Sequence, residues 1–498
     1  KSEQRALLQF NKPDNANKVR SALIKAGRSD LIGFSGECLV KPERAPHFDK
    51  KSDKKNDKNA ISGLQALIVS TATRVGMGNM VGVVAAISAG GAGAVFWMWV
   101  TAIIGSSTAF VEATLAQLHK QSDPLYGGYR GGPAYYIHNF FVKDKTKRWS
   151  VMAVLFALSG LLCWCGVSQV ISNSVSSAFE NAFGVPPIVS TVILVALAAV
   201  IVLRKNATIK VLDIMVPVMA VFYFAIAVFV IVKNIGLMPS VLQRIVEEAF
   251  GLRQVVAGGF GAALMNGVKR GLFSNEAGSG SAPCAAAAAN VSHPAKSGLF
   301  QAFGVFIDTI VICSCTAMIM LLAPEELLEG LSGMELLQTA MYHHFGSPGV
   351  VFIAITLWLF SFSTFIGILY YARSNVAYLF GDNWPSQTAY KVLALVMLFI
   401  GGLAAYTFVW DLGDIGIALM TIFNLIDQVL PHIVTNLSDA QIIEYATTGL
   451  TILGNGGKME TFRIPQDDAH YNANIRGMAV LVPDLDMCRE DLHEFLFD

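Results

Sequence analysis

The chain has 498 residues, of which 54% are hydrophobic and 14% are charged. This apolar share is too high for a soluble protein of that length, and it indicates a membrane protein that crosses the bilayer several times. The 36 basic and 36 acidic residues cancel, so the net charge favours neither a nucleic acid nor an acidic partner.

Charged residues divide the chain into three parts. The first 60 residues hold 14 of the 36 Lys and Arg residues, and 431–498 is also polar, whereas the residues between them form a succession of apolar runs. The sequence therefore predicts a soluble basic segment over 1–60, a transmembrane core over 61–430 and a separate C-terminal fragment over 431–498.

Ten apolar runs in this core approach the roughly 20 residues that a spanning helix needs. The predicted all-α membrane core has spans at 61–88, 92–118, 150–178, 187–203, 211–233, 258–290, 298–323, 349–380, 389–406 and 410–430. Glycine and polar residues interrupt the first and the sixth. The sixth span comes five positions after the first, so the two cross the membrane in opposite directions. The second half is therefore expected to repeat the first in inverted orientation, which is typical of secondary transporters.

The connections between the spans alternate in charge. Basic residues lie before the first span, in KKSDKKNDK, and in every even-numbered connection, as at Arg204 and Lys205. The other connections carry no basic residue, are acidic, as at Glu325 and Glu326, or are mixed. Since basic loops stay in the cytoplasm, both termini are predicted to be cytoplasmic and the protein to lie in a cell membrane, the inner membrane of a bacterium.

The first interruption reads TATRVGMGNMVG, from Thr71 to Gly82. Gly76 and Gly78 relax the helix and let a ligand approach the backbone. The half-helix that begins near Asn79 would direct free N–H groups and a positive dipole end at mid-membrane, where they suit a carboxylate. Unpaired backbone is tolerated in a bilayer only where it lines a cavity or is buried in protein, so this interruption predicts a binding site.

The second interruption reads GVKRGLFSNEAGSGSAP, from Gly267. Gly278 and Gly280 permit unwinding, and Pro283 begins the continuing half. Polar atoms come from Ser274, Asn275, Glu276, Ser279 and Ser281. Two breaks in corresponding positions favour one site for a small zwitterion over the alternative, in which the glycines are helix-packing notches and the charges extend to the interface.

Two acidic residues stand inside the apolar runs. Glu276 is expected to pair with Arg270 or Lys269 and to serve either the substrate or a gate. Asp308, in GVFIDTIVIC, is either a coupling residue or a structural partner. On the third span, Gln169 lies one turn before Asn173, and this shared face predicts a cavity wall.

Hydroxyl groups gather on the eighth span, at Ser361, Ser363 and Thr364. Hydroxyl and carbonyl oxygens are hard ligands of the kind that sodium prefers. The alternative is that these side chains form hydrogen bonds between helices.

Seven cysteines form no Cys-x-x-Cys motif. The pairs Cys163/Cys165 and Cys313/Cys315 are two residues apart and point to nearly opposite sides of a helix, so neither pair suits a shared metal. Packing alone is expected for them.

Six motifs, in order, make residues 61–428 similar to the alanine or glycine:cation symporter family, the sodium:alanine symporters. In chain order they are RVGMGNMVGV, GGAGAVFWMWVTAIIG, FVEATLAQLHK, YRGGPAYYI, GVKRGLFSNEAGSGSAP and NVSHPAKSGL. The resemblance implies two inverted five-helix repeats of LeuT-like arrangement. It also implies a transporter that moves a small neutral amino acid with sodium as the coupling ion, with no catalytic residues and no cofactor.

The resemblance also implies which residues form the site. The substrate-binding set is Gly76, Met77, Gly78, Asn79, Gln169, Ser274, Asn275, Ala277, Gly278, Ser279 and Gly280. Sodium is expected at Val75, Ser361, Ser363 and Thr364, while Glu276, Arg270 and Asp308 are gate or structural residues.

The chain departs from the family pattern in and around this site. Met77 stands where the family usually has Thr, Ser279 replaces a common Met, and Ile368 stands where Trp or Asn is usual. Arg373 occupies a position that is often acidic. These departures bear on which substrate the chain accepts.

The two ends resemble unrelated families. Residues 1–50, with RSDLIGFSGECLVKP, are similar to the C-terminal tail of a radical-SAM family, without the cysteines that bind its cluster. Residues from Leu437 resemble the last part of a LytR–CpsA–Psr wall-polymer transferase. The hypothesis is that three coding segments are joined and that the middle one carries the function.

Three classes of function follow. The leading one is sodium-coupled symport of alanine or glycine by alternating access, with a small neutral amino acid, sodium and the lipid bilayer as partners and no nucleic acid. The second is a non-functional or sensor-like chimera. The third is a wall-polymer transferase, against which the truncated C-terminal fragment and the loop charges argue.

Overall fold

The computed structural model describes residues 61–142, 148–203, 208–252 and 259–434, together with Val19, Ala22 and Leu23. The predicted end segments lie outside the described residues, apart from these three and the last turn of the final helix. Residues Lys1–Lys58 and Asn59–Asp498 form two separate units, and the second contains every element described below.

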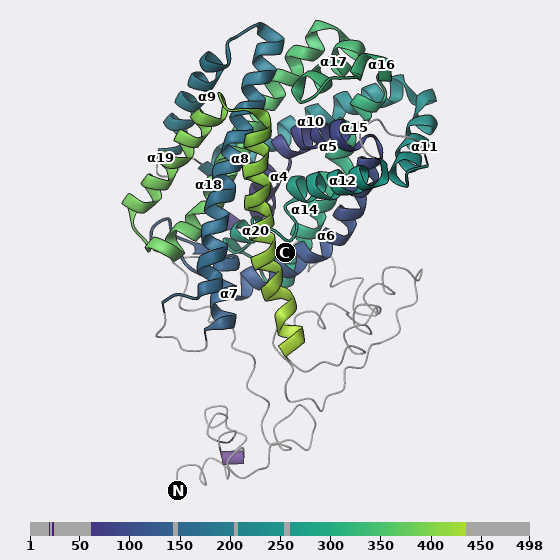
Figure 1. Ribbon diagram of the computed structural model, residues 1–498. Coiled ribbons are helices and arrows are strands. Elements are labelled where there is room, and N and C mark those ends of the chain that lie inside the picture. Colours follow the sequence, from purple (N-terminus) through teal and green to yellow (C-terminus); the bar gives the residue numbers. More distant parts are fainter. Residues whose placement is uncertain are drawn as a thin grey trace. The chain divides into compact units, whose positions relative to one another are not determined.

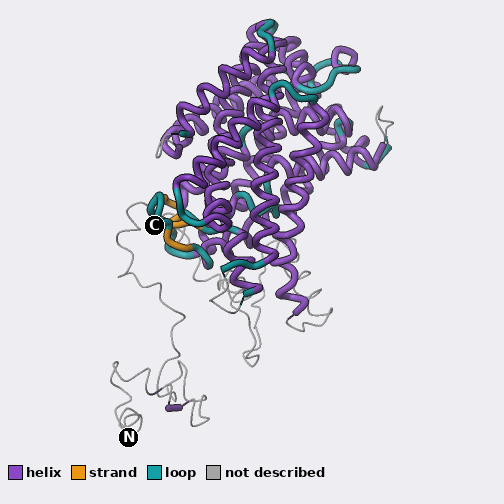
Figure 2. The backbone as a smooth tube through the Cα atoms, turned by 60° about the vertical axis from the view of Figure 1, so that its left-hand side comes forward, coloured by secondary structure: helices purple, strands orange, loops and turns teal. Residues whose placement is uncertain are grey.

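The first half of the second unit is almost entirely helical (Figures 1 and 2). Its elements are β1 (Ile61–Ser62), α4 (Gly63–Arg74), η3 (Gly78–Gly82), α5 (Val83–Gly90), α6 (Gly93–Leu118), β2 (Gln121–Ser122), β3 (Tyr129–Arg130), α7 (Pro133–Phe141), α8 (Val151–Phe183), α9 (Pro187–Val202), α10 (Thr208–Lys233), η4 (Ile235–Leu237) and α11 (Met238–Ala249). Ser62 starts α4 with a reciprocal cap, because its hydroxyl accepts from the Gln65 N–H while the Gln65 side chain accepts from the Ser62 N–H.

The second half is also mainly helical and has a similar succession of elements. Its elements are α12 (Gly259–Asn275), α13 (Ala282–Ala286), β4 (Ala289–Asn290), α14 (Pro294–Phe306), η5 (Ile307–Cys313), α15 (Ser314–Leu321), α16 (Glu325–Leu328), α17 (Met334–Phe345), α18 (Ser347–Phe380), α19 (Trp384–Gly401) and α20 (Tyr406–Val434). β1 pairs in parallel with β4, with Ile61 opposite Ala289, so the start of the first run is joined to the end of the sixth. β2 and β3 form an antiparallel pair.

Each of the ten predicted runs coincides with a helix or a series of helices. Among the described residues, five helices are long and apolar enough to cross a membrane, and the pair α10 and α11, bent by 74°, counts as a sixth candidate. The chain therefore has the helical character of a membrane transporter, and the number of ten crossings stays a prediction.

The ninth run is displaced from its predicted bounds of 389–406. The Asn383 side chain accepts the Ser386 N–H and Pro385 occupies the first turn, so α19 begins at Trp384. The helix ends at Gly401, where the α19 backbone passes so close to Gln169 of α8 that a Cβ would collide with it. A capping residue and a helix contact, rather than hydropathy, set these bounds.

The long helix α8 lies at the centre of one group of helices, where it packs against α18, α19 and α20. In Figure 1, α8 and α20 run beside one another through the middle of the helical part. A second group forms around α6, which packs against α12 and α14. The helix α4 before the first break and the helix α13 after the second break contact members of both groups, α14 or α6 on one side and α18 on the other.

Candidate functional site

The first run breaks where sequence analysis places its interruption. α4 ends at Arg74, and the Gly76 N–H donates both to the Arg74 carbonyl (2.8 Å) and to Asn79 Oδ1 (2.9 Å). Gly76 is needed for space, because a Cβ there would collide with the Thr364 hydroxyl of α18. The chain then continues as a π-helical turn, η3, with Asn79 fully buried.

The sixth run is interrupted more completely. α12 ends at Asn275, Glu276 adopts the left-handed region with φ of +56°, and α13 starts only at Ala282. Gly278 and Gly280 have φ values of +79° and +80°, which few residues other than glycine adopt without strain. The unwound segment therefore exposes backbone groups in the middle of an apolar run.

Glu112 of α6 satisfies these exposed groups. Its carboxylate accepts the N–H of Gly278 (3.3 Å) and the N–H of Gly280 (3.2 Å). Asn424 of α20 donates to Glu112 Oε2 (2.8 Å) and to the Gly278 carbonyl (2.9 Å), and its own Oδ1 accepts from the Tyr136 hydroxyl. This role of Glu112 was not predicted from the sequence, although a single carboxylate within an apolar run is itself a sign of function.

Asp308 of η5 joins the two breaks. Its carboxylate accepts from Asn79 Nδ2 (2.7 Å), from the Ser274 hydroxyl (3.0 Å) and from the Thr309 hydroxyl (2.9 Å). All four side chains are buried. The structure thus assembles Asn79, Ser274 and Asp308, which sequence analysis named from three separate runs. Cys313, for which packing alone was expected, also contacts this group, with its sulfur 3.2 Å from both Asn79 Nδ2 and the Ser274 hydroxyl.

Arg74 is the buried cation beside these acids, and sequence analysis gave it no role. One guanidinium nitrogen, Nη1, donates to the backbone and side-chain oxygens of Gln301 (3.3 and 3.0 Å). Within the described ranges, Nε and Nη2 have no hydrogen-bond partner. The positive charge of Arg74 attracts three buried carboxylates, those of Glu112, Glu276 and Asp308.

Glu276 does not pair with Arg270 or Lys269, so that expectation was wrong. Glu276 lies beyond the end of α12 and adopts a left-handed φ, so its side chain leaves the helix that carries Arg270 and Lys269. Glu276 instead accepts from the Thr73 hydroxyl of α4 (3.3 Å). Arg270 makes a bidentate pair with Asp414 of α20 (2.9 Å for each bond), and Lys269 Nζ lies 2.6 Å from the same carboxylate.

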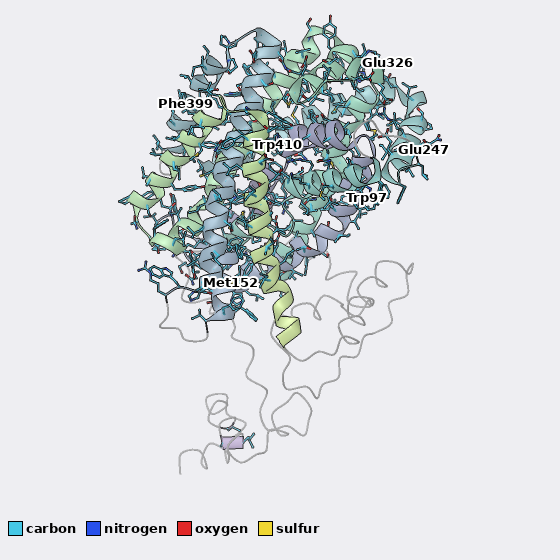
Figure 3. The ribbon with its side chains drawn as sticks, viewed as in Figure 1. Trp97, Met152, Glu247, Glu326, Phe399 and Trp410 are labelled. Atoms are coloured by element: carbon cyan, nitrogen blue, oxygen red, sulfur yellow. The ribbon has the colours of Figure 1, made fainter. Side chains whose placement is uncertain are left out.

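An aromatic cluster lies beneath this ion pair. The Arg270 guanidinium stacks on the Trp410 ring at 4.0 Å, and the Trp410 and Phe273 rings are 4.9 Å apart. Trp410, labelled in Figure 3, lies among the helices rather than at their outer surface.

A small cavity lies between the breaks and these rings. Its volume of about 20 Å³ is close to that of a single water molecule. Its walls come from both breaks and from α8, α18 and α20: Thr73, Met77, Gly78, Cys163, Trp164, Val167, Phe273, Glu276, Ser281, Thr364, Ile368 and Ile417. Two departures from the family pattern, Met77 and Ile368, therefore face the same space.

The predicted sodium ligands are brought together only in part. The Thr364 hydroxyl accepts from the Met77 N–H (3.3 Å), which places α18 against the first break beside Val75. The Ser363 hydroxyl donates to the Phe360 carbonyl of its own helix (2.8 Å). The Ser361 hydroxyl is buried and finds no hydrogen-bond partner in the part of the chain that the structure describes.

Gln169 lies apart from the breaks, so its predicted place at the substrate cavity was wrong. Its side chain contacts Met397 of α19 and lines a different cavity. Asn173, one turn further, donates to the Gly401 and Ala404 carbonyls. The reason is helix geometry, because Cys163, Trp164 and Val167 face the breaks and Gln169 lies on the other side of α8.

Comparison with known proteins identifies the chain's relatives. The model of the sodium:alanine symporter family matches residues 43–445. A second family model, described as a domain of unknown function (DUF3362), matches residues 1–74. The chain is 47% identical to the probable sodium/glutamine symporter GlnT of Bacillus subtilis, over 74% of this chain and 76% of the relative.

Two further relatives and one solved structure agree with this result. The amino-acid carrier protein AlsT of Bacillus subtilis is 42% identical over 75% of this chain and 78% of its own length. The sodium/alanine symporter AgcS of Methanococcus maripaludis is 35% identical over 77% and 84%. The crystal structure of MhsT in complex with L-phenylalanine matches with a TM-score of 0.53 at 14% identity, over 74% of this chain and 89% of that one.

These matches confirm the family resemblance of the sequence motifs and the helical transporter fold. The family couples transport to sodium, and its members are transporters rather than enzymes. The chain belongs to the sodium:alanine symporter family.

Proposed function

We propose that this protein is a sodium-coupled symporter of small neutral amino acids, with alanine and glycine as substrates, that works by alternating access in the cell membrane. The observation that carries the proposal is the meeting of two unwound segments at a buried polar cluster of Asn79, Ser274 and Asp308. Broken helices that meet at mid-membrane are where such transporters bind substrate and ions.

The proposed topology has ten crossings in two inverted five-helix repeats, with both termini in the cytoplasm. Helices in corresponding positions of the two halves pack in pairs, α6 with α14, α8 with α18 and α9 with α19. This pairing supports the inverted repeat, and the alternating loop charges support the orientation. The parts of the segments 1–60 and 431–498 that lie outside the family match over 43–445 are proposed to be additions without a part in transport.

The substrate carboxylate is proposed to bind the backbone N–H groups of the first break, from Gly76 to Asn79, in place of the hydrogen bonds that Gly76 and Met77 donate to Asn79 Oδ1 and the Thr364 hydroxyl. The unwound segment from Ser274 to Gly280 supplies the remaining polar contacts. The substrate side chain then faces Met77, Ile368 and Trp164. A cavity of this volume has to expand to admit an amino acid, and its apolar walls favour a short side chain.

Sodium is proposed to bind next to the substrate, at hard oxygen ligands from several helices. The Ser361 hydroxyl, buried without a partner among the residues that the structure describes, supports the set of Val75, Ser361, Ser363 and Thr364. The Asp308 carboxylate with Asn79 and Ser274 supplies a second group of suitable oxygens. In both places the ion would tie the first break to another helix, which couples its binding to closure.

Arg270 and Asp414 are proposed to form the gate on the outer side. Their ion pair lies over the rings of Trp410 and Phe273, and Phe273 borders the central cavity. Opening this gate requires α20 and α12 to move apart. The substrate then enters, and closure on substrate and sodium together commits the site to face inward.

The direct test is uptake of labelled alanine by proteoliposomes that contain the full chain, with an inward sodium gradient or with choline in place of sodium. Sodium-dependent accumulation is the expected result. Equal uptake in choline contradicts sodium coupling. No uptake by a folded, monodisperse protein contradicts symport of this substrate and favours the inert chimera. Limited proteolysis tests the ends, since resistance of both segments argues against their being additions.

A further inference from the structure

A second, much larger cavity lies on the opposite side of α8 from the substrate site. It is a groove of about 770 Å³ between α8, α19 and α20, within the range of about 300–1,000 Å³ that holds most small ligands. Its walls are mainly hydrocarbon, and several of its residues, among them Leu393 and Phe408, are exposed. Two further lining residues, Leu162 and Ile400, are also exposed, so the groove opens on the part of the helical core that faces lipid.

Three side chains with oxygen or nitrogen atoms, Gln169, Ser386 and Tyr390, interrupt this apolar surface. The side chain of Gln169 lines the groove and is only 2% exposed, yet its Oε1 has no hydrogen-bond partner among the described residues. The two hydroxyl groups of the groove are satisfied, because Ser386 donates to the Asn383 carbonyl and Tyr390 donates to the Leu161 carbonyl. A buried acceptor without a donor costs about 1–3 kcal/mol, and the broad final torsion of a Gln side chain lets the amide turn toward a ligand.

We propose that this groove binds a membrane-dissolved amphiphile with one long alkyl chain and a hydroxyl head group, whose hydroxyl donates to Gln169 Oε1. The alkyl chain occupies the apolar walls. A phospholipid tail fills such walls equally well, but it brings no donor for Gln169. The hydroxyl is therefore the feature that this site selects.

The groove lies back to back with the machinery proposed above, across two helices. On α8, Cys165 and Gln169 line the groove, whereas Trp164 and Val167 line the central cavity. On α20, Phe408 and Leu412 line the groove, whereas Trp410 and Asp414 engage Arg270. An occupant wedged between α8 and α20 therefore opposes the movement of α20 that opens the gate. This effect on transport rests on the proposed function, whereas the binding itself does not.

The test uses the full chain in phosphatidylcholine nanodiscs and two photoreactive probes, a diazirine-bearing dodecanol and its methyl ether, which has no donor. Peptide mapping is expected to find saturable labelling of α8 and α19 by the alcohol, with at least roughly tenfold weaker apparent affinity for the ether, equivalent to one hydrogen bond. Gln169→Leu should lower the affinity for the alcohol to that for the ether. Equal labelling by both probes, or labelling that does not saturate, overturns the proposal and identifies ordinary lipid contact.

A pair of α19 variants separates the site from general effects on the membrane. Ala389→Phe narrows the groove from an exposed lining position, while Thr388→Phe adds the same ring outside the lining. Dodecanol should lower the maximal rate of sodium-driven alanine uptake, with KM unchanged, in the wild type and in Thr388→Phe but not in Ala389→Phe. Equal inhibition of all three proteins contradicts the regulatory effect. If none of them takes up alanine without dodecanol, symport fails, and the labelling still decides the binding site.

Discussion

At the scale of single residues, Asn79 is the side chain on which the two breaks most depend. Its Oδ1 accepts the Gly76 N–H, and its Nδ2 donates to the carboxylate and the carbonyl of Asp308. Asn79→Ala removes these bonds and leaves a buried carboxylate with fewer donors, at a cost of about 1–3 kcal/mol per unsatisfied group. We expect sodium-driven uptake to fall at least roughly tenfold, while the protein stays monodisperse.

The matched control for this prediction is Asn173→Ala. Asn173 also donates to backbone carbonyls, those of Gly401 and Ala404, but it does so on the far side of α8. The Asn173→Ala variant should lose some thermal stability and keep its affinity for sodium. Normal uptake by Asn79→Ala would remove the central assignment of the site.

Met77 is the residue expected to set substrate size. It lines a cavity of about 20 Å³ together with Ile368, and a single methylene in such a pocket changes selectivity by about 1–3 kcal/mol. We expect Met77→Thr to let glutamine compete with labelled alanine at a concentration at least roughly tenfold lower than in the wild type. Met80→Thr, a buried change outside the cavity lining, should leave the glutamine concentration that competes with labelled alanine unchanged. If the competing glutamine concentration is the same in all three proteins, Met77 does not set substrate size.

At the scale of elements, Glu112 holds the unwound segment of the sixth run. Both of its carboxylate oxygens accept backbone N–H groups, at Gly278 and Gly280. Glu112→Gln turns an NH₂ group toward one of these donors, and loss of that bond destabilises the segment by about 1–3 kcal/mol. We expect faster amide hydrogen exchange over 276–281 and a lower Tm. Glu247→Gln, at the surface of α11 (Figure 3), should change neither.

The sequence predicts elements well where local physics determines them. Glycines beside polar residues inside apolar runs locate both interruptions, because an unwound helix needs flexible backbone and hydrogen-bonding atoms. Contacts across long sequence distances were not predictable in the same way. The contacts of Glu112 with the Gly278 N–H and of Arg270 with Asp414 depend on how α6, α12 and α20 pack together. The spacing of residues within a single helix does not predict them.

Gln169 illustrates the same limit from the opposite direction. Periodicity correctly put it on one face with Asn173, but it does not say which neighbour covers that face. Only the close approach of Gly401 to the α8 backbone reveals that α19 lies there. A face can be read from sequence, whereas its partner requires the fold.

At the scale of the whole molecule, the described core is closed around its central cavity, and the Arg270–Asp414 pair is the proposed outer closure. A native thiol reports on it. Cys163 lines the cavity, whereas Cys165, two residues further on α8, lines the groove on the other side. A water-soluble, membrane-impermeant maleimide therefore reaches Cys163 only when the outer gate opens.

Asp414→Asn is expected to open that gate more often. Breaking a largely buried bidentate ion pair costs about 3–5 kcal/mol, and even a third of this energy shifts an equilibrium roughly tenfold. Peptide mass spectrometry should show Cys163 modified at least roughly tenfold faster than in the wild type, with sodium and alanine together slowing the reaction. Cys165 is the internal control, because it lines the groove on the lipid side of α8, which opening of the outer gate does not connect to water. Equal acceleration at both thiols indicates general loosening of α8, and an unchanged rate at Cys163 places the outer closure elsewhere than at Arg270 and Asp414.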